Sequence, residues 1–119
     1  MSTLECAELN FLLDREGAII AFQEKDASWA GALAFSSEEN ARRFVAISQL
    51  EVAEVAAVAL DDRGSVAALV TALKRRPIRY LLLDLDYHTG ACRQVDFAGD
   101  DLGVVSARQF SANHTPGRR

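Results

Sequence analysis

Cysteine, proline and tryptophan are scarce in this sequence of 119 residues, which contains two, two and one of them. Cys6 and Cys92 lie far apart and match no metal-binding spacing, which favours two free thiols and leaves a disulfide between them open. The sequence also lacks an apolar run of roughly 18 residues, which excludes a transmembrane helix. Its first residues lack the basic start and apolar stretch of a signal peptide. We therefore expect a cytoplasmic protein.

Positive charge is scarce as well. The chain has 13 Lys and Arg against 17 Asp and Glu, a formal net charge of −4, and its basic residues cluster only at residues 74–76 and 118–119. Nucleic acids and anionic membranes both bind basic surfaces, because counterion release and attraction to lipid headgroups require positive charge. We therefore expect neither a nucleic-acid partner nor a membrane partner.

The first third of the chain predicts short strands. Residues 9–14 and 18–23 are apolar runs, and Gly17 ends the link between them. A three-residue link with glycine last suits a hairpin turn, because glycine adopts the left-handed backbone conformation cheaply. Residues 32–35 form a third short apolar run, which predicts a strand that continues the meander.

A helix follows these strands. Ser36 or Ser37 can cap it, and Glu39 stands three positions after Ser36, as in a capping box. The end of this helix is ambiguous, because neither glycine nor proline interrupts the alanine-rich stretch that follows. We predict a strand at residues 54–60, since its β-branched residues Val55 and Val58 are typical of strands.

The second helix has a clearer pattern. Pro77 ends it and Ser65 can cap its start. Its apolar residues recur at helical spacing: Val66, Leu69, Val70 and Leu73. A buried strand is predicted at residues 78–87, an antiparallel strand at residues 91–97 and a short edge element at residues 102–110.

These elements predict an α+β fold, a mixed β-sheet with two helices in the order ββ(β)αβαββ. The strand around Val55, the second helix and the strand around Leu81 form one βαβ crossover, so we expect these strands to be parallel, with a right-handed connection. Residues 1–110 form a single α+β domain, as the length predicts. Residues 111–119 carry no packing signal and are predicted to be a disordered tail.

Residues 79–88 change from apolar to acidic along the predicted strand. With period two, Asp84, Asp86 and His88 share one face, and Asp61 follows the preceding strand. Because ligands bind at the carboxyl ends of parallel strands and carboxylates suit Mg²⁺, these four residues could serve a small divalent-metal-dependent enzyme or ligand-binding domain. Structural roles for the acids are favoured, since the sequence has no phosphate-binding glycine loop and several arginines could pair with them.

Aromatic residues around the third strand indicate a second candidate site. Trp29, Phe22 and Phe35 could form an exposed patch, and tryptophan is enriched where proteins bind one another. The patch would bind a protein partner or a second copy of the chain in a homodimer. The alternative is that Trp29 closes the edge of the core.

One short motif resembles a known family. The stretch from Ala34 to Glu39 reads Ala-Phe-Ser-Ser-Glu-Glu and resembles the Phe-Thr-Ser/Asp-Glu-Glu start of the helix in SseB-type N-terminal domains. The order of elements over residues 9–97 is similar to theirs. The chain departs from the family at residues 86–90, where members tend to have an Asn-Pro turn. The resemblance implies a small non-catalytic module that associates with other proteins, and no catalytic residues carry over.

The favoured hypothesis is a non-catalytic protein-interaction or regulatory module that needs no cofactor. It rests on missing catalytic motifs, since the sequence has no GxSxG nucleophile motif and its histidines are His88 in a predicted turn and His114 in the predicted tail. The sequence leaves enzyme activity open, and Mg²⁺ is the cofactor of the alternative hypothesis.

Overall fold

The computed structural model describes residues 4, 6–23 and 30–110, which contain seven strands and two helices. The predicted α+β fold and its order of elements are confirmed, and the ambiguous stretch after the first helix is a strand. The predicted tail, residues 111–119, lies outside the described residues. In chain order the elements are β1 (Glu8–Leu13), β2 (Ala21–Gln23), β3 (Ala30–Phe35), α1 (Glu38–Ser48), β4 (Glu54–Ala59), α2 (Arg63–Lys74), β5 (Ile78–Leu83), β6 (Ala91–Ala98) and β7 (Asp101–Gln109).

The described strands form one mixed sheet in the order β4-β1-β3-β5-β6-β7, with β2 paired to the first half of β3. Among them only β3 and β5 pair in parallel. The strands around Val55 and Leu81, β4 and β5, run in the same direction, as predicted for the crossover, and β1 and β3 lie between them. The reason is that β1 is apolar on both faces, with Leu9 and Leu12 buried on opposite sides, and such a strand takes a central place.

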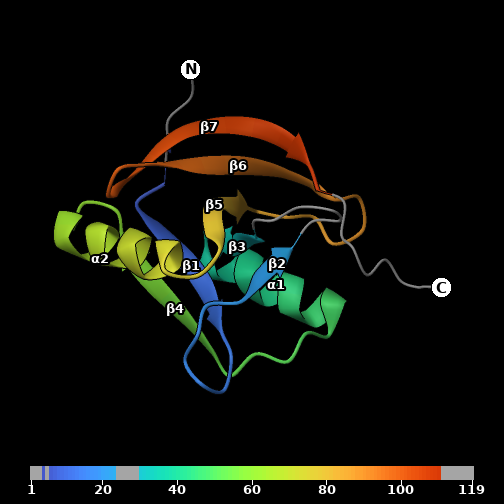
Figure 1. The fold of residues 1–119 in the computed structure, drawn as a ribbon. Coiled ribbons are helices and arrows are strands. Elements are labelled where there is room, and N and C mark those ends of the chain that lie inside the picture. The colour runs from blue at the N-terminus through green and yellow to red at the C-terminus, as the bar shows by residue number, and fades with distance from the viewer. Residues whose placement is uncertain (1–3, 5, 24–29, 111–119) are drawn as a thin grey trace.

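Each helix covers one face of the sheet. α2 and the arching β6–β7 hairpin lie on the same side and contact each other (Figure 1). That layer buries Leu9, Phe11, Ala32, Ala34, Leu69, Leu73, Ile78, Leu81, Leu83, Val95 and Val105. α1 covers the opposite face, where the buried residues are Leu12, Leu33, Phe35, Ala41, Phe44, Tyr80, Leu82, Leu85 and Phe110. The central strands are therefore covered from both sides.

The cap of α1 is one of the two serines predicted, whereas the cap of α2 differs from the prediction. α1 is capped by Ser37, whose Oγ accepts a hydrogen bond from the Asn40 N–H at 3.1 Å, one residue later than the capping box predicted from Ser36. α2 is capped by Asp62, and Ser65 is its donor, through the backbone N–H at 3.1 Å and Oγ–H at 2.9 Å. Aspartate caps a helix as well as serine does, so sequence alone did not rank the two.

β5 ends earlier than predicted. Its side chains alternate between the two faces from Tyr80 to Leu83, but Asp84 has a φ of 53°, in the left-handed region. The alternation predicted to continue to residue 88 therefore breaks, and Leu85 packs in the α1 layer beside Leu82. Aspartate is one of the few residues other than glycine that tolerate this conformation.

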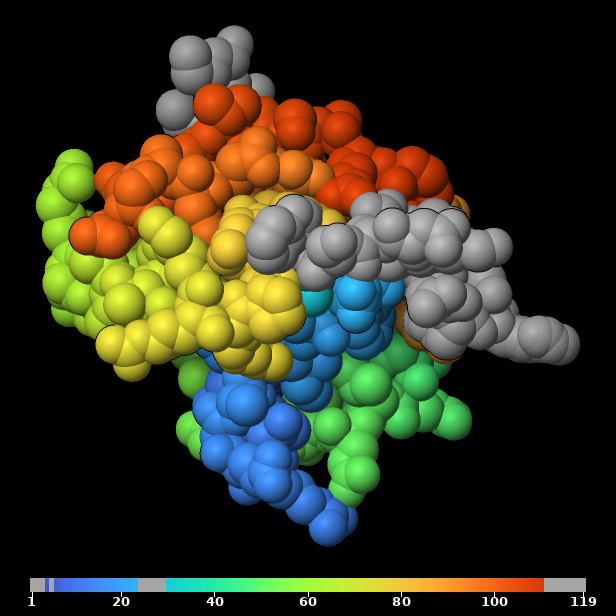
Figure 2. All heavy atoms as spheres, in the orientation of Figure 1, coloured from blue at the N-terminus to red at the C-terminus, as the bar shows by residue number. Residues whose placement is uncertain are grey.

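The predicted turn between the first two strands is confirmed, although only the isolated bridge between Leu13 and Ile19 pairs the two sides and β2 itself pairs with β3. Gly17 has a φ of 80°, and the Asp14 carboxylate accepts hydrogen bonds from the backbone N–H groups of Glu16 at 2.9 Å and Ala18 at 3.0 Å. This turn projects from the end of the molecule opposite the β6–β7 hairpin (Figure 2). Within the described residues no helix is long and apolar enough to cross a membrane.

Candidate functional site

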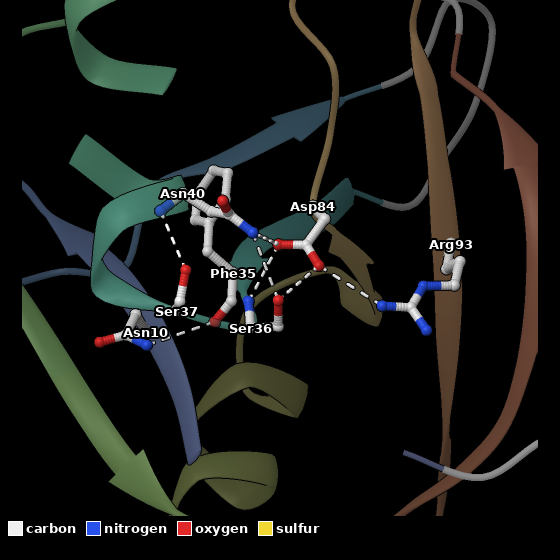
Figure 3. Close-up of polar contacts among 7 residues, drawn as sticks. All are labelled: Asn10, Phe35, Ser36, Ser37, Asn40, Asp84 and Arg93. Carbon is white, nitrogen blue, oxygen red and sulfur yellow. Dashed lines mark hydrogen bonds and ion pairs between the residues drawn. The ribbon is translucent and has the colours of Figure 1, made fainter. Parts of the chain in front are cut away.

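Asp84 joins three elements where β5 ends. One carboxylate oxygen accepts hydrogen bonds from the Ser36 N–H at 2.9 Å and the Asn40 side-chain amide at 3.3 Å, and the other accepts from Ser36 Oγ–H at 2.8 Å (Figure 3). Arg93 on β6 lies 3.4 Å from the second oxygen. The carboxylate therefore ties the β3–α1 turn to the ends of β5 and β6.

A second polar side chain reinforces this end of the sheet. Asn10 on β1 is 2% exposed, and its amide donates to the backbone oxygen of Phe35 at 3.5 Å (Figure 3). It also donates to the Glu8 carboxylate at 3.4 Å. Buried amides are costly unless they are bonded, so Asn10 fixes β1 against the last residue of β3. The start of α1 is therefore held from two sides.

Asp86 organises the turn that follows. Its carboxylate accepts hydrogen bonds from the backbone N–H groups of His88 at 2.9 Å and Thr89 at 3.2 Å. These bonds, with Thr89 first, hold the pKa of Asp86 below its usual value, because they stabilise the charged form. Gly90 closes the turn with a φ of 80°, and a Cβ there would lie 2.5 Å from the backbone oxygen of Phe110.

A hollow of about 250 Å³ lies between α1 and this turn. Two exposed apolar side chains border it, Ile47 at 43% and Tyr87 at 48%. The Tyr87 ring meets Phe44 edge-on at 5.8 Å between ring centroids and His88 at 5.9 Å. The lining residues are Phe35, Asn40, Arg43, Phe44, Ile47, Asp84, Leu85, Asp86, Tyr87 and His88.

Tyr87 also borders a second hollow, of about 330 Å³. Phe22 and Gln23 of β2 line this hollow together with Ser48 and Leu50 at the end of α1. Tyr87 thus lines two depressions. We refer to Ile47, Tyr87 and His88, with the hollow of about 250 Å³ beside them, as the Tyr87 surface.

The predicted metal residues are only partly brought together. Asp84, Asp86 and His88 line the same hollow, but hydrogen bonds already engage both oxygens of Asp84 and one oxygen of Asp86. Asp61 is exposed and lines a separate hollow beside Asp101, because two strands intervene between β4 and β5. The described residues include no group of three or more His, Cys, Asp or Glu side chains placed to hold a metal ion.

The predicted aromatic patch is corrected in one respect. Phe35 is 1% exposed and packs against Phe44 with 5.3 Å between ring centroids, so its ring is part of the core. Trp29 lies outside the described residues. The exposed aromatic side chain at this end is Tyr87, which the period-two pattern had placed inside the strand. The signal that could have found it is Asp84, whose residue type suits a left-handed break in the strand.

Both cysteines are free, half-buried thiols. Burial raises the pKa of Cys92, and it raises the pKa of Cys6 together with the nearby Asp84 carboxylate. A raised pKa leaves little thiolate at neutral pH, and the thiolate is the nucleophile. Their environments therefore do not activate either thiol.

Comparison with protein-family models, with curated proteins and with solved structures finds no match. The resemblance to SseB-type domains stays a prediction that rests on the start of α1 and on element order.

Proposed function

We propose that this chain is a small non-catalytic protein-interaction module whose protein partner binds at the Tyr87 surface. The observation that supports it most is the position of the exposed apolar side chains. Ile47, Tyr87 and Val104 are the large hydrophobic residues exposed within the described chain, and the first two flank one hollow. Adjacent exposed apolar residues beside a depression are typical of binding surfaces, whereas single ones are ordinary.

The chemistry of this surface suits a protein segment. Tyrosine is enriched among residues that dominate binding energies, because it buries a large ring while its hydroxyl stays hydrated. The Phe44 ring packs edge-on with the Tyr87 ring, and Arg43 and His88 supply polar groups that line the hollow. An apolar side chain of the partner would enter the hollow, and the polar groups would set its orientation.

The hydrogen bonds of Asp84 and Asp86 fit this proposal better than they fit catalysis. They fix the β3–α1 turn, from which α1 starts, and residues 86–89, which include Tyr87 and His88. A surface that is already ordered loses less conformational entropy when a partner binds. A metal ion at Asp84 would have to displace its bonds from Ser36 and Asn40, which favours a structural role for this carboxylate.

The test uses matched exposed positions. A photo-crosslinking amino acid replaces either Ile47 or Val104, whose side chains are 43% and 45% exposed, in cells that produce the protein. We expect a discrete adduct from position 47 and none from position 104, and its mass distinguishes a partner from a second copy.

The captured protein is then purified and titrated against defined variants. We expect Ile47→Ser and Tyr87→Ser to weaken its binding by about tenfold or more each, as for residues near the centre of an interface. Val104→Ser should leave the affinity unchanged. Equal crosslinking at both positions, or equal affinities for all three variants, would overturn the proposal.

A further inference from the structure

The strand order β4-β1-β3-β5-β6-β7 ends in an edge strand on each side, and β4 is one of them. The Leu60 N–H donates to the Ala7 oxygen at 2.9 Å, which continues the β1–β4 register and shows that even-numbered residues bond to β1. Because bonding alternates along a strand, the N–H and C=O groups of Val55 and Ala57 point away from β1. No residue among those described pairs with these outward groups.

The other edge, β7, is protected against further pairing. Its register with β6 shifts between Val95↔Val105 and Phe97↔Leu102, so β7 contains an extra residue, a bulge at Gly103 or Val104. Bulges and strong curvature are the means by which proteins block strand addition, and β7 visibly arches (Figure 1). β4 pairs with β1 without a register shift, and its sequence from Val55 to Leu60 contains no charge, proline or glycine.

A hollow beside β4 could receive side chains of an added strand. It has a volume of about 400 Å³ and lies between β4 and α1. Val45, Ala46 and Val55 give it an apolar lining, while Arg42 and Glu54 stand at its border. It lies on the flank of α1 away from Ile47, so it is separate from the Tyr87 surface.

Charge at the two ends of β4 indicates the kind of strand that fits. Glu54 and Asp61 bracket the apolar run, and within the described chain neither has an ion-pair partner. A second copy paired antiparallel would bring Glu54 near the acids at the other end of its partner's strand, and a parallel copy would align like charges. Both arrangements repel.

We infer that the β4 edge binds an extended segment of a partner protein, whose apolar run is flanked by lysine or arginine at both ends. The segment adds as an edge strand through the outward groups of Val55 and Ala57. Its alternate side chains enter the hollow beside α1, and its basic ends pair with Glu54 and Asp61. This is recognition by strand addition, in which backbone hydrogen bonds supply affinity and flanking pockets and charges supply selectivity.

The test uses the full chain and a defined probe, the capped peptide Lys-Val-Thr-Val-Thr-Val-Thr-Lys. We expect saturable binding, with shifts of the backbone amide NMR signals of Val55, Ala57 and Ala59. The same core flanked by glutamates should bind about tenfold more weakly, because two ion pairs become two repulsions. A peptide with proline in its core should not bind.

A matched pair of variants locates the site. Ala57→Pro removes an outward N–H at β4, and Ala107→Pro removes the equivalent outward N–H at β7, where even-numbered residues bond to β6. Proline is tolerated at edge positions whose N–H faces solvent, and circular dichroism confirms the fold of each variant. We expect Ala57→Pro to abolish peptide binding and Ala107→Pro to retain it.

The wild-type NMR spectra make the test independent of how well the variants fold. Signal shifts at β7 or at Tyr87 instead of β4, or equal affinity for lysine-flanked and glutamate-flanked peptides, would overturn the inference. Concentration-dependent shifts at β4 without peptide would also overturn it, since they would make a second copy the occupant. Failure of the inference leaves the proposed function standing, because the crosslinking at position 47 tests the Tyr87 surface separately.

Discussion

Replacing Asp84 by alanine tests whether its carboxylate holds the end of the sheet together. The side chain is 24% exposed, and alanine would remove the acceptor for three hydrogen bonds from Ser36 and Asn40. Alanine is also poorly suited to the left-handed backbone at this position, where φ is 53°. Both effects destabilise the folded state.

The expected loss follows from these contacts. Three hydrogen bonds at roughly 1 kcal/mol each, and about 1 kcal/mol for alanine in the left-handed region, give about 4 kcal/mol. The ion pair with Arg93 adds little, because that side chain is half exposed. A loss of this size is a large share of the roughly 5–15 kcal/mol that stabilises a typical domain.

Two further variants separate the causes. Asp84→Asn keeps the tolerance for left-handed backbone and one acceptor oxygen, so we expect it to lose only about 1–2 kcal/mol. Asp100→Ala removes an exposed acid and should change stability by about 0.5 kcal/mol or less. Urea unfolding of the variants and the wild type gives the free energies of unfolding.

The same assay can refute this account and also tests the metal hypothesis. Two results would contradict a structural role for these hydrogen bonds. The first is that Asp84→Ala is as stable as Asp100→Ala, and the second is that Asp84→Ala and Asp84→Asn lose equal amounts of stability. Addition of Mg²⁺ should leave the wild-type unfolding free energy unchanged. If a Mg²⁺ site existed, a Mg²⁺ concentration of about 100 times its Kd would instead raise the free energy of unfolding by about 2.7 kcal/mol.

Three further predictions concern other parts of the fold. Asp62→Ala should lower the urea midpoint at neutral pH, because hydrogen bonds from Ser65 stabilise the charged Asp62 and lower its folded-state pKa. The difference in midpoint between the variant and the wild type should vanish as pH falls below the ordinary pKa of 3.8 and through the lowered pKa. Cys92 should react with a thiol reagent more slowly in the folded protein than in urea, because burial raises its pKa. Gly31→Ala should destabilise by about 1–3 kcal/mol in urea unfolding, since its Cβ would lie 2.6 Å from the Tyr80 ring, and unchanged stability would contradict this packing.

Local patterns in the sequence predicted the elements well. Val66, Leu69, Val70 and Leu73 are all buried on α2, because helical spacing alone places them on one face. Gly17 forms the predicted left-handed turn, since few other residues adopt that conformation cheaply. These features depend on residues close together in the chain.

Tertiary structure decided which strands pair and which side chains reach the surface. β1 lies between β3 and β4 because it forms hydrogen bonds to both strands and packs its side chains into both core layers. These contacts are to residues far away in the sequence, so no local pattern encodes them. Asp84 leaves the strand conformation because Ser36 and Asn40 hold its carboxylate. That one backbone change ends the alternation and brings Tyr87 to the surface, while Phe35 is buried beneath α1. The sequence thus determined the elements, and long-range contacts determined the candidate site.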